Sequence, residues 1–340
     1  MSMSSPEQDL ILILMGDIYK MPNISIPKKI DWDKFLRLAS LNKVSYYAVM
    51  KMMEDHNLDI EPEILKQAAM LRELEKEKLA KLGPSLEVAE SALGQEPHLL
   101  SKTYRGYPHV THDIDFLVHD LKKAQILFEK NGHKPLLWWD KRSFEVVEEG
   151  LLEIEIYDKI SPGPYIFIDD SVVWSGNREA VIEGIKVRLP SIEADIMTYL
   201  ADMSFRIYEI LMGDVVYLYQ LSAEADWKLM AEQAKKHNWL EQFDNMVAIL
   251  NGLHRRLYGE ASPMEEYLPT IAQVDLDFPY ILSFPQVTRN LLGKGAKNLV
   301  KLPGYYSVRL KKGYPRLHKI YSKLVLVYLG QILGKYVYRS

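Results

Sequence analysis

The sequence predicts an α+β protein in which a mixed β-sheet lies between an N-terminal and a C-terminal helical region. Apolar side chains recur at helical spacing through the first 95 residues. The pattern then changes to the two-residue alternation of strands, and helical spacing returns after Pro190. A group of strands bounded by runs of helices is typical of the α+β class.

The N-terminal helices are predicted from their start and stop signals. Ser5 precedes Pro6 and Gln8, which is the pattern of a capping box with proline at the first helical position. Residues 32–53 carry a helical apolar face, and a further helix begins at Pro62. The Gly-Pro pair at 83–84 should break that helix, with Ser85 capping a short one that stops near residue 94.

The central strands are predicted from alternation and from the turns between them. Asp120 begins a helix that ends before Gly132, and Gly150 lies in the turn of a hairpin. The predicted strands are residues 98–101, 113–118, 143–147, 151–157, 166–168 and 185–189.

These elements divide the chain into four regions. Ser191 is placed to cap the first helix after the sheet. We predict an N-terminal helical region, an α+β core, a helical domain and a basic C-terminal region, with bounds at 1–84, 85–190, 191–260 and 261–340.

Composition excludes several classes of protein. The 340 residues are 48% hydrophobic and 26% charged, which is typical of a globular protein and not of a disordered or collagen-like chain. With no cysteine, the chain has no disulfide, no zinc-binding thiolate and no thiol nucleophile. The apolar runs at 10–15 and 324–334 are too short to span a membrane, which needs about 20 residues. We therefore expect a cytoplasmic protein.

Charge is divided unevenly along the chain. Residues 286–340 hold twelve Lys and Arg and no acid, so the net charge of −4 for the whole chain leaves −16 for the rest. Such a basic segment should attract polyanions, and salt should weaken that attraction. Three alternatives stay open: the segment contacts RNA or DNA, covers the acidic body, or lies on a membrane surface.

The residues that indicate chemistry are two aspartates at the start of the strand at 113–118. Alternation places Asp113 and Asp115 on one face of the sheet. Two carboxylates so close repel each other unless a cation lies between them, and hard oxygen ligands suit Mg²⁺ or Mn²⁺. A third carboxylate on a neighbouring strand would complete a metal site. Glu155 is the preferred candidate because it is central in its strand, and Glu153 is the reserve.

A second group of candidates lies just upstream of the aspartates. Ser101, Lys102 and Arg105 fall on a segment that passes from a strand into a turn. A hydroxyl, exposed backbone N–H groups and two cations are what a triphosphate needs for binding. We therefore predict that these three residues bind a chain of phosphates, with surface salt bridges as the alternative for Lys102 and Arg105.

Together these residues carry a family resemblance. Ser101-Lys-Thr-Tyr-Arg-Gly followed by Asp113-Ile-Asp-Phe-Leu-Val resembles the DNA polymerase β-like nucleotidyltransferase superfamily, and is most similar to its uncharacterised members from bacteria and archaea. The resemblance covers roughly residues 85–225. It implies a five-stranded mixed sheet and Mg²⁺-dependent transfer of NMP from an NTP such as ATP. It matches Ser101 to the motif serine, Asp113 and Asp115 to the metal-binding aspartates, and Glu155 to the third carboxylate.

The acceptor is an unknown molecule with a hydroxyl group, of which tRNA or another RNA is one candidate. Two alternative functions come from other classes. One is a non-catalytic nucleic-acid-binding or antitoxin-like module on a degenerate nucleotidyltransferase fold. The other is a structural protein that lies on a membrane surface.

Overall fold

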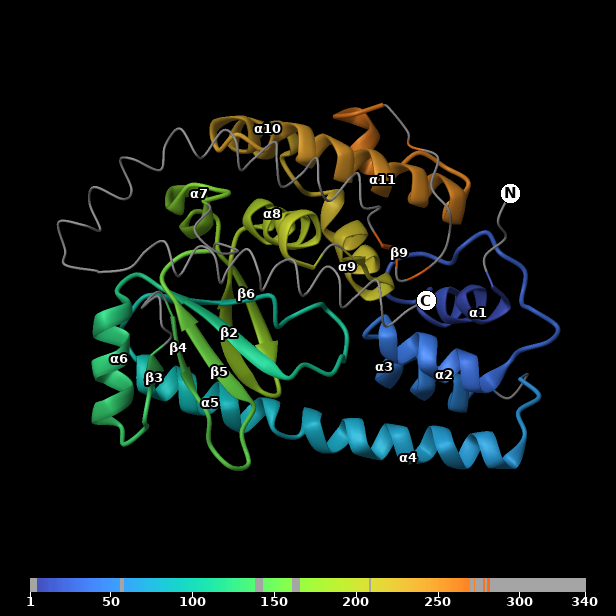
Figure 1. The fold of residues 1–340 in the computed structure, drawn as a ribbon, viewed down its shortest axis with the longest axis horizontal. Helices are drawn as coiled ribbons and strands as arrows, with labels where there is room; N and C mark the ends of the chain where they lie inside the picture. Colours follow the sequence, from blue (N-terminus) through green and yellow to red (C-terminus); the bar gives the residue numbers. More distant parts are fainter. Residues whose placement is uncertain are drawn as a thin grey trace, which may run out of the picture. The chain divides into compact units, whose positions relative to one another are not determined.

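The computed structural model describes residues 5–281 apart from 56–57, 138–142, 161–165, 208, 270–271, 273–277 and 279. The described elements all belong to one compact unit (Figure 1). They form a mixed five-stranded sheet with helical regions before and after it in the chain, so the predicted α+β class is confirmed. The whole of the basic segment 286–340, and with it each alternative for its role, lies outside the described residues.

The N-terminal region is helical, as predicted. The capping box at Ser5 is present, with both of its reciprocal hydrogen bonds. The predicted helix over 32–53 is two helices, because Lys43 has a φ of 56° and this left-handed conformation interrupts the helical path. The four helices are α1 (Pro6–Leu14), α2 (Trp32–Leu41), α3 (Ser45–Glu54) and α4 (Pro62–Leu79).

The next helix, α5 (Leu82–Leu93), corrects the prediction for the Gly-Pro pair. Pro84 lies in the first turn, where a missing N–H breaks no intrahelical hydrogen bond. Ser85 is therefore inside α5 and is not its cap: its Oγ donates to the Lys81 carbonyl at 2.7 Å and accepts from the Leu152 N–H at 2.8 Å. The predicted boundary between residues 84 and 85 thus falls within one helix.

The sheet contains five strands in the order β1-β2-β5-β4-β3. Strands β2 and β5 are parallel, and the other neighbours are antiparallel. This agrees with the five-stranded mixed sheet that the resemblance implies. The strands are β1 (His98–Ser101), β2 (Asp113–Val118), β3 (Leu136–Leu137), β4 (Ser143–Val146) and β5 (Glu153–Tyr157), and α6 (Leu121–Lys130) follows β2.

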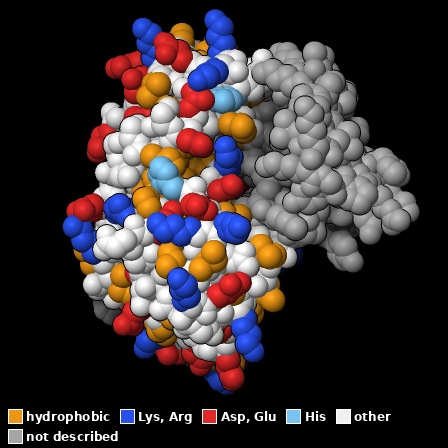
Figure 2. Space-filling view, turned by 90° about the vertical axis from the view of Figure 1, so that its left-hand side faces the viewer, with side chains coloured by type: hydrophobic (Ala, Val, Ile, Leu, Met, Phe, Trp, Pro, Cys, Tyr) orange, Lys and Arg blue, Asp and Glu red, His pale blue; other side chains and the backbone are white. Residues whose placement is uncertain are grey.

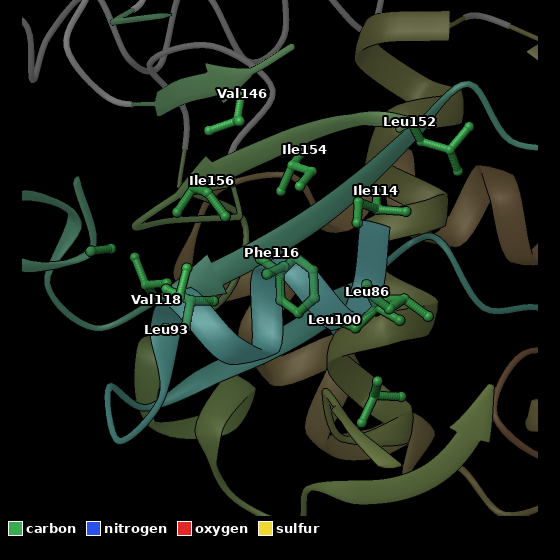
Figure 3. Close-up of a cluster of buried hydrophobic side chains, with 14 of the residues drawn as sticks. Leu86, Leu93, Leu100, Ile114, Phe116, Val118, Val146, Leu152, Ile154 and Ile156 are labelled. Carbon is green, nitrogen blue, oxygen red and sulfur yellow. The ribbon is translucent and has the colours of Figure 1, made fainter. Parts of the chain in front are cut away.

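One face of this sheet is the main hydrophobic core. The inward side chains of β2 and β5 are fully buried and pack against α5 and α6 (Figure 3). Burial of this kind contributes about 25 cal/mol per Å² of apolar surface. The sheet residues that Figure 3 labels in this core are Leu100, Ile114, Phe116, Val118, Val146, Ile154 and Ile156.

After β5 the chain forms α7 (Asp170–Trp174) and a hairpin of β6 (Arg178–Ile182) and β7 (Ile185–Leu189). The predicted strand at 166–168 is wrong. Phe167 instead packs its ring against those of Phe205 and Trp239, at centroid distances of 5.2 and 5.4 Å. Alternation of apolar residues there reflects burial under helices and not pairing in a sheet.

The C-terminal helical region lies on the other side of the sheet, where α8 faces it from the side opposite α5 (Figure 1). Ser191 caps the first helix after the sheet, as predicted, and this helix ends at Asp202 and continues as a π-helical turn, Met203–Ile207. No helix in the described ranges is both long and apolar enough to cross a membrane. The elements are α8 (Ile192–Asp202), β8 (Glu209–Ile210), α9 (Met212–Ser222), α10 (Trp227–Lys236), α11 (Leu240–Tyr258), a 3₁₀ turn (Pro263–Glu266) and β9 (Tyr280–Ile281).

Candidate active site

The polar face of the sheet carries acidic side chains on adjacent strands. In the parallel pair of β2 and β5, Asp113 is opposite Glu153 and Asp115 is opposite Glu155. Residues opposite each other share a face, so all four carboxylates lie on the side away from the core. Ser101 on β1 is opposite Asp115 and shares this face. The backbone therefore brings the serine and the predicted acids together.

A fifth acid, Glu145, was missed in the sequence. It lies on β4 opposite Glu155, and so extends the acidic row to a third strand. Burial, then a hydrogen bond and the charge of Glu145, and then the charges of Asp113 and Asp115, raise the pKa of Glu153. The alternation of β4 was visible in the sequence and could have placed Glu145 on this face.

These carboxylates fit a divalent cation in chemistry and in register. They offer hard oxygen donors on neighbouring strands, and burial first and then the neighbouring acids raise the pKa of Glu153. In the described ranges, however, no three Asp, Glu or His side chains converge closely enough to hold an ion as they stand. The strand register places the carboxylates on one face of the sheet, and their side chains would have to rotate to converge on an ion.

A tight turn joins Ser101 to the acidic strand. The Thr103 N–H donates to the Ser101 carbonyl at 2.7 Å, and Lys102 between them has a φ of 58°. Thr103 Oγ1 in turn accepts from the Asp115 N–H at 3.1 Å. This fixes the turn beside Asp115. Leu100, the residue before Ser101, points into the core on the opposite face of the sheet.

Lys102 lies between the sheet and α8. Its Nζ is 3.5 Å from Asp202 Oδ2 and 5.8 Å from the centroid of the Tyr157 ring. The Tyr199 hydroxyl donates to the Lys102 carbonyl at 3.0 Å, so α8 contacts both the backbone and the side chain of this residue. The Lys102 side chain remains 20% exposed, which leaves it accessible to a ligand.

Arg105, which the sequence predicts to bind phosphate, is instead paired with an acid inside the protein. Its guanidinium is buried and lies 2.6 Å from Asp214 on α9. The close packing requires Gly213, because a Cβ there would lie 2.6 Å from the Tyr107 hydroxyl and 3.1 Å from Arg105 Nη1. Arg105 therefore joins the motif loop to the C-terminal helices.

The surface that Figure 2 shows carries Lys and Arg interspersed with Asp and Glu, and hydrophobic side chains lie between them. The acidic excess of the body is thus not gathered into one patch on this face. The acidic row described above is distinguished by its register across strands and not by the amount of charge around it.

Comparison with known proteins gives distant similarities of fold. No known family model matches the sequence, and no curated protein matches it. The structure is similar to that of the lincosamide antibiotic adenylyltransferase LnuA with lincomycin bound, at 16% identity and a TM-score of 0.31 over 44% of this chain and 98% of that one. It is also similar to the antibiotic-resistance factor ANT(2'')-Ia, at 13% identity and a TM-score of 0.33 over 51% of this chain and 96% of that one. At these values the likeness assigns neither activity nor substrate.

Proposed function

We propose that this chain is a metal-dependent nucleotidyltransferase that transfers NMP from an NTP to a hydroxyl-bearing acceptor and releases pyrophosphate. The observation that supports this most directly is the register of Asp113, Asp115 and Glu155, with Ser101 on the next strand. Like charges in such a row cost free energy in the free protein. A cation that arrives with the substrate phosphates would offset that cost.

Each residue has a separate role in this proposal. Asp113, Asp115 and Glu155 would hold Mg²⁺ or Mn²⁺, and Ser101 and Lys102 would bind the β- and γ-phosphates. When bound, the ion would neutralise phosphate charge and favour ionisation of the acceptor hydroxyl. Arg105 would position the turn through its ion pair with Asp214 and would not touch phosphate.

The reaction is an in-line displacement at the α-phosphorus. The acceptor oxygen forms a bond to that phosphorus, and the bond from it to the oxygen bridging to the β-phosphate breaks. Pyrophosphate leaves with that oxygen, and the hydroxyl proton passes to solvent. Ser101 and Lys102 would hold the leaving group in line and stabilise its charge, so catalysis rests on positioning and electrostatics.

The test is transfer of label from an NTP. The purified protein is incubated with each α-labelled NTP in turn, with Mg²⁺ or Mn²⁺ and a cell extract as the source of acceptor. We expect a labelled product with the wild type and a loss of about 10²–10³-fold in Asp115→Asn, the size seen when one charge-stabilising group is removed. The matched control is Glu129→Gln, which removes one exposed carboxylate from α6 on the opposite side of the sheet.

Two outcomes would contradict the proposal. Equal labelling by the wild type and Asp115→Asn would remove the acidic row from the reaction. Absence of any labelled product, together with salt-sensitive RNA binding that is the same in both proteins, would favour the non-catalytic nucleic-acid-binding alternative.

A further inference from the structure

Tyr157 is a buried residue on the acidic face, and no sequence pattern singles it out. It is the last residue of β5, two positions beyond Glu155, and therefore points to the same side of the sheet. Its side chain is 8% exposed. Its hydroxyl and that of Ser101 are both buried, and neither completes a hydrogen bond of normal geometry within the described residues.

The Ser101 hydroxyl lies near that of Tyr157 and lowers its pKa, but the two form no hydrogen bond of normal geometry. Two buried hydroxyls that lack a well-formed hydrogen bond need an explanation. Leaving such a group unpaired costs about 1–3 kcal/mol. Other buried tyrosines of this protein avoid the cost: the Tyr217 hydroxyl donates to Asp195, and the Tyr219 hydroxyl donates to the Leu250 carbonyl. The Tyr107 hydroxyl also makes no hydrogen bond of normal geometry, but it lies beside the Arg105 guanidinium, and a Cβ on Gly213 would already be too close to it, so there is no space for a ligand there.

The surroundings of Tyr157 are the residues assigned to the reaction. Burial and then the charge of Asp115 raise its pKa, Lys102 and the Ser101 hydroxyl lower it, and Glu155 raises it. The Lys102 ammonium also lies 5.8 Å from the ring centroid, within the range of a cation–π contact. Tyr157 thus lies between the proposed phosphate-binding residues and the proposed metal ligands.

We propose that the Tyr157 and Ser101 hydroxyls together bind a non-bridging oxygen of the NTP triphosphate, with Lys102 held over the Tyr157 ring as the counter-charge. This inference rests on the proposed function and adds a binding group to its site. A phosphate oxygen has lone pairs enough to accept from both hydroxyls at once. Binding would give a well-formed hydrogen bond to two hydroxyls that lack one in the free protein, which makes the site selective for an acceptor-rich anion.

The test is Tyr157→Phe, which keeps the ring and removes only the hydroxyl. Calorimetric titration with ATP and with inorganic tripolyphosphate, each with Mg²⁺, should show affinity lower by about tenfold for both ligands. The melting temperature of the ligand-free variant should be equal to or above that of the wild type, because an unpaired buried hydroxyl has been removed. Ser101→Ala combined with Tyr157→Phe should weaken binding by less than the product of the two single effects, because both hydroxyls act on one oxygen.

The matched control is Tyr219→Phe, which removes a buried hydroxyl that has a partner 2.8 Å away. That variant should melt at a lower temperature and bind ATP as the wild type does. The two substitutions therefore have opposite expected signs for stability and different effects on binding.

The outcomes separate this inference from the proposed function. If the wild type binds ATP and Tyr157→Phe binds it equally well, the inference is wrong and the proposed function stands. If ATP binding weakens but tripolyphosphate binding does not, or if Tyr157→Phe melts at a clearly lower temperature, the hydroxyl has another role and the inference is overturned. If the wild type binds neither ligand, the proposed function itself fails.

Discussion

The two faces of the central sheet come from the same strands and serve opposite purposes. On one face Ile114, Phe116 and Ile154 are fully buried against helices. On the other face Asp115 and Glu155 alternate with them, in a row of like charges. Burial of the apolar face stabilises the folded state, and repulsion among the acids of the other face destabilises it. A protein keeps such an arrangement where the costly face has a use, and the comparison therefore indicates where to look for a site.

The polar side is itself divided between closed and open parts. Arg105 and Asp214 are both nearly inaccessible and paired at 2.6 Å. Lys102 is partly exposed, with its Nζ 3.5 Å from Asp202. Lys102 and Arg105 lie three positions apart in the same motif. Their side chains differ in burial because different parts of the protein pack against each one.

The largest expected effect sharpens the contrast between the faces. Phe116→Ala should lower the free energy of unfolding by about 3–5 kcal/mol, because it leaves a cavity in a packed core. Asp115→Asn, one residue away and on the other face, should change it by less than about 1 kcal/mol. Urea denaturation followed by circular dichroism measures both. Similar losses in the free energy of unfolding for the two variants would mean that Asp115 stabilises the fold. The contrast between a stabilising apolar face and a destabilising acidic face would then be wrong.

The next effect concerns the closed part of the polar side. Arg105→Ala leaves the Asp214 carboxylate buried without its partner and should cost about 3 kcal/mol in the free energy of unfolding. Lys102→Ala should leave stability nearly unchanged and weaken Mg²⁺-ATP binding. The double variant Arg105→Met with Asp214→Leu should recover much of the stability lost in Arg105→Ala. If Arg105→Ala were as stable as the wild type but bound ATP poorly, Arg105 would be a phosphate-binding residue after all.

What the sequence could predict depended on local patterns. The capping box at Ser5 and the strand at 113–118 follow from neighbouring residues, and both are present. Alternation also gives the face of each side chain, which is why the two aspartates share one side. Glu145 required only the same alternation and one further step, its pairing with β5.

What could not be predicted depended on contacts between distant parts of the chain. The burial of Arg105 is decided by Asp214 and Gly213 on α9, more than a hundred residues away. Phe167 resembled a strand residue because apolar burial under helices and in sheets leaves the same local pattern. The missing hydrogen bond of Tyr157 is likewise a property of packing and has no signature in sequence.

The smallest expected effect tests whether the acidic face carries a free-energy cost at all. The pKa of Glu153 is raised above its ordinary value of 4.5, so the native state holds this proton at pH values where the unfolded chain has lost it. The free energy of unfolding should therefore fall as the pH rises from 4.5 through the raised native pKa. Glu153→Gln removes this titration, and the variant should be the more stable protein at neutral pH, by a margin that grows over that interval.

Two further variants test whether repulsion among the acids, rather than burial alone, causes this pH dependence of the free energy of unfolding. Glu145→Gln removes the carboxylate that accepts a hydrogen bond from protonated Glu153 and repels its ionised form, so it should lower the pKa of Glu153 and flatten the pH dependence in part. Glu129→Gln makes the same charge change on exposed α6 and should leave the dependence as in the wild type. Thermal melts at a series of pH values in a common low-salt buffer measure all three. A difference between Glu153→Gln and the wild type that stays constant with pH would mean that the acids of this face do not repel one another, and the contrast between the two faces would then rest on the core alone.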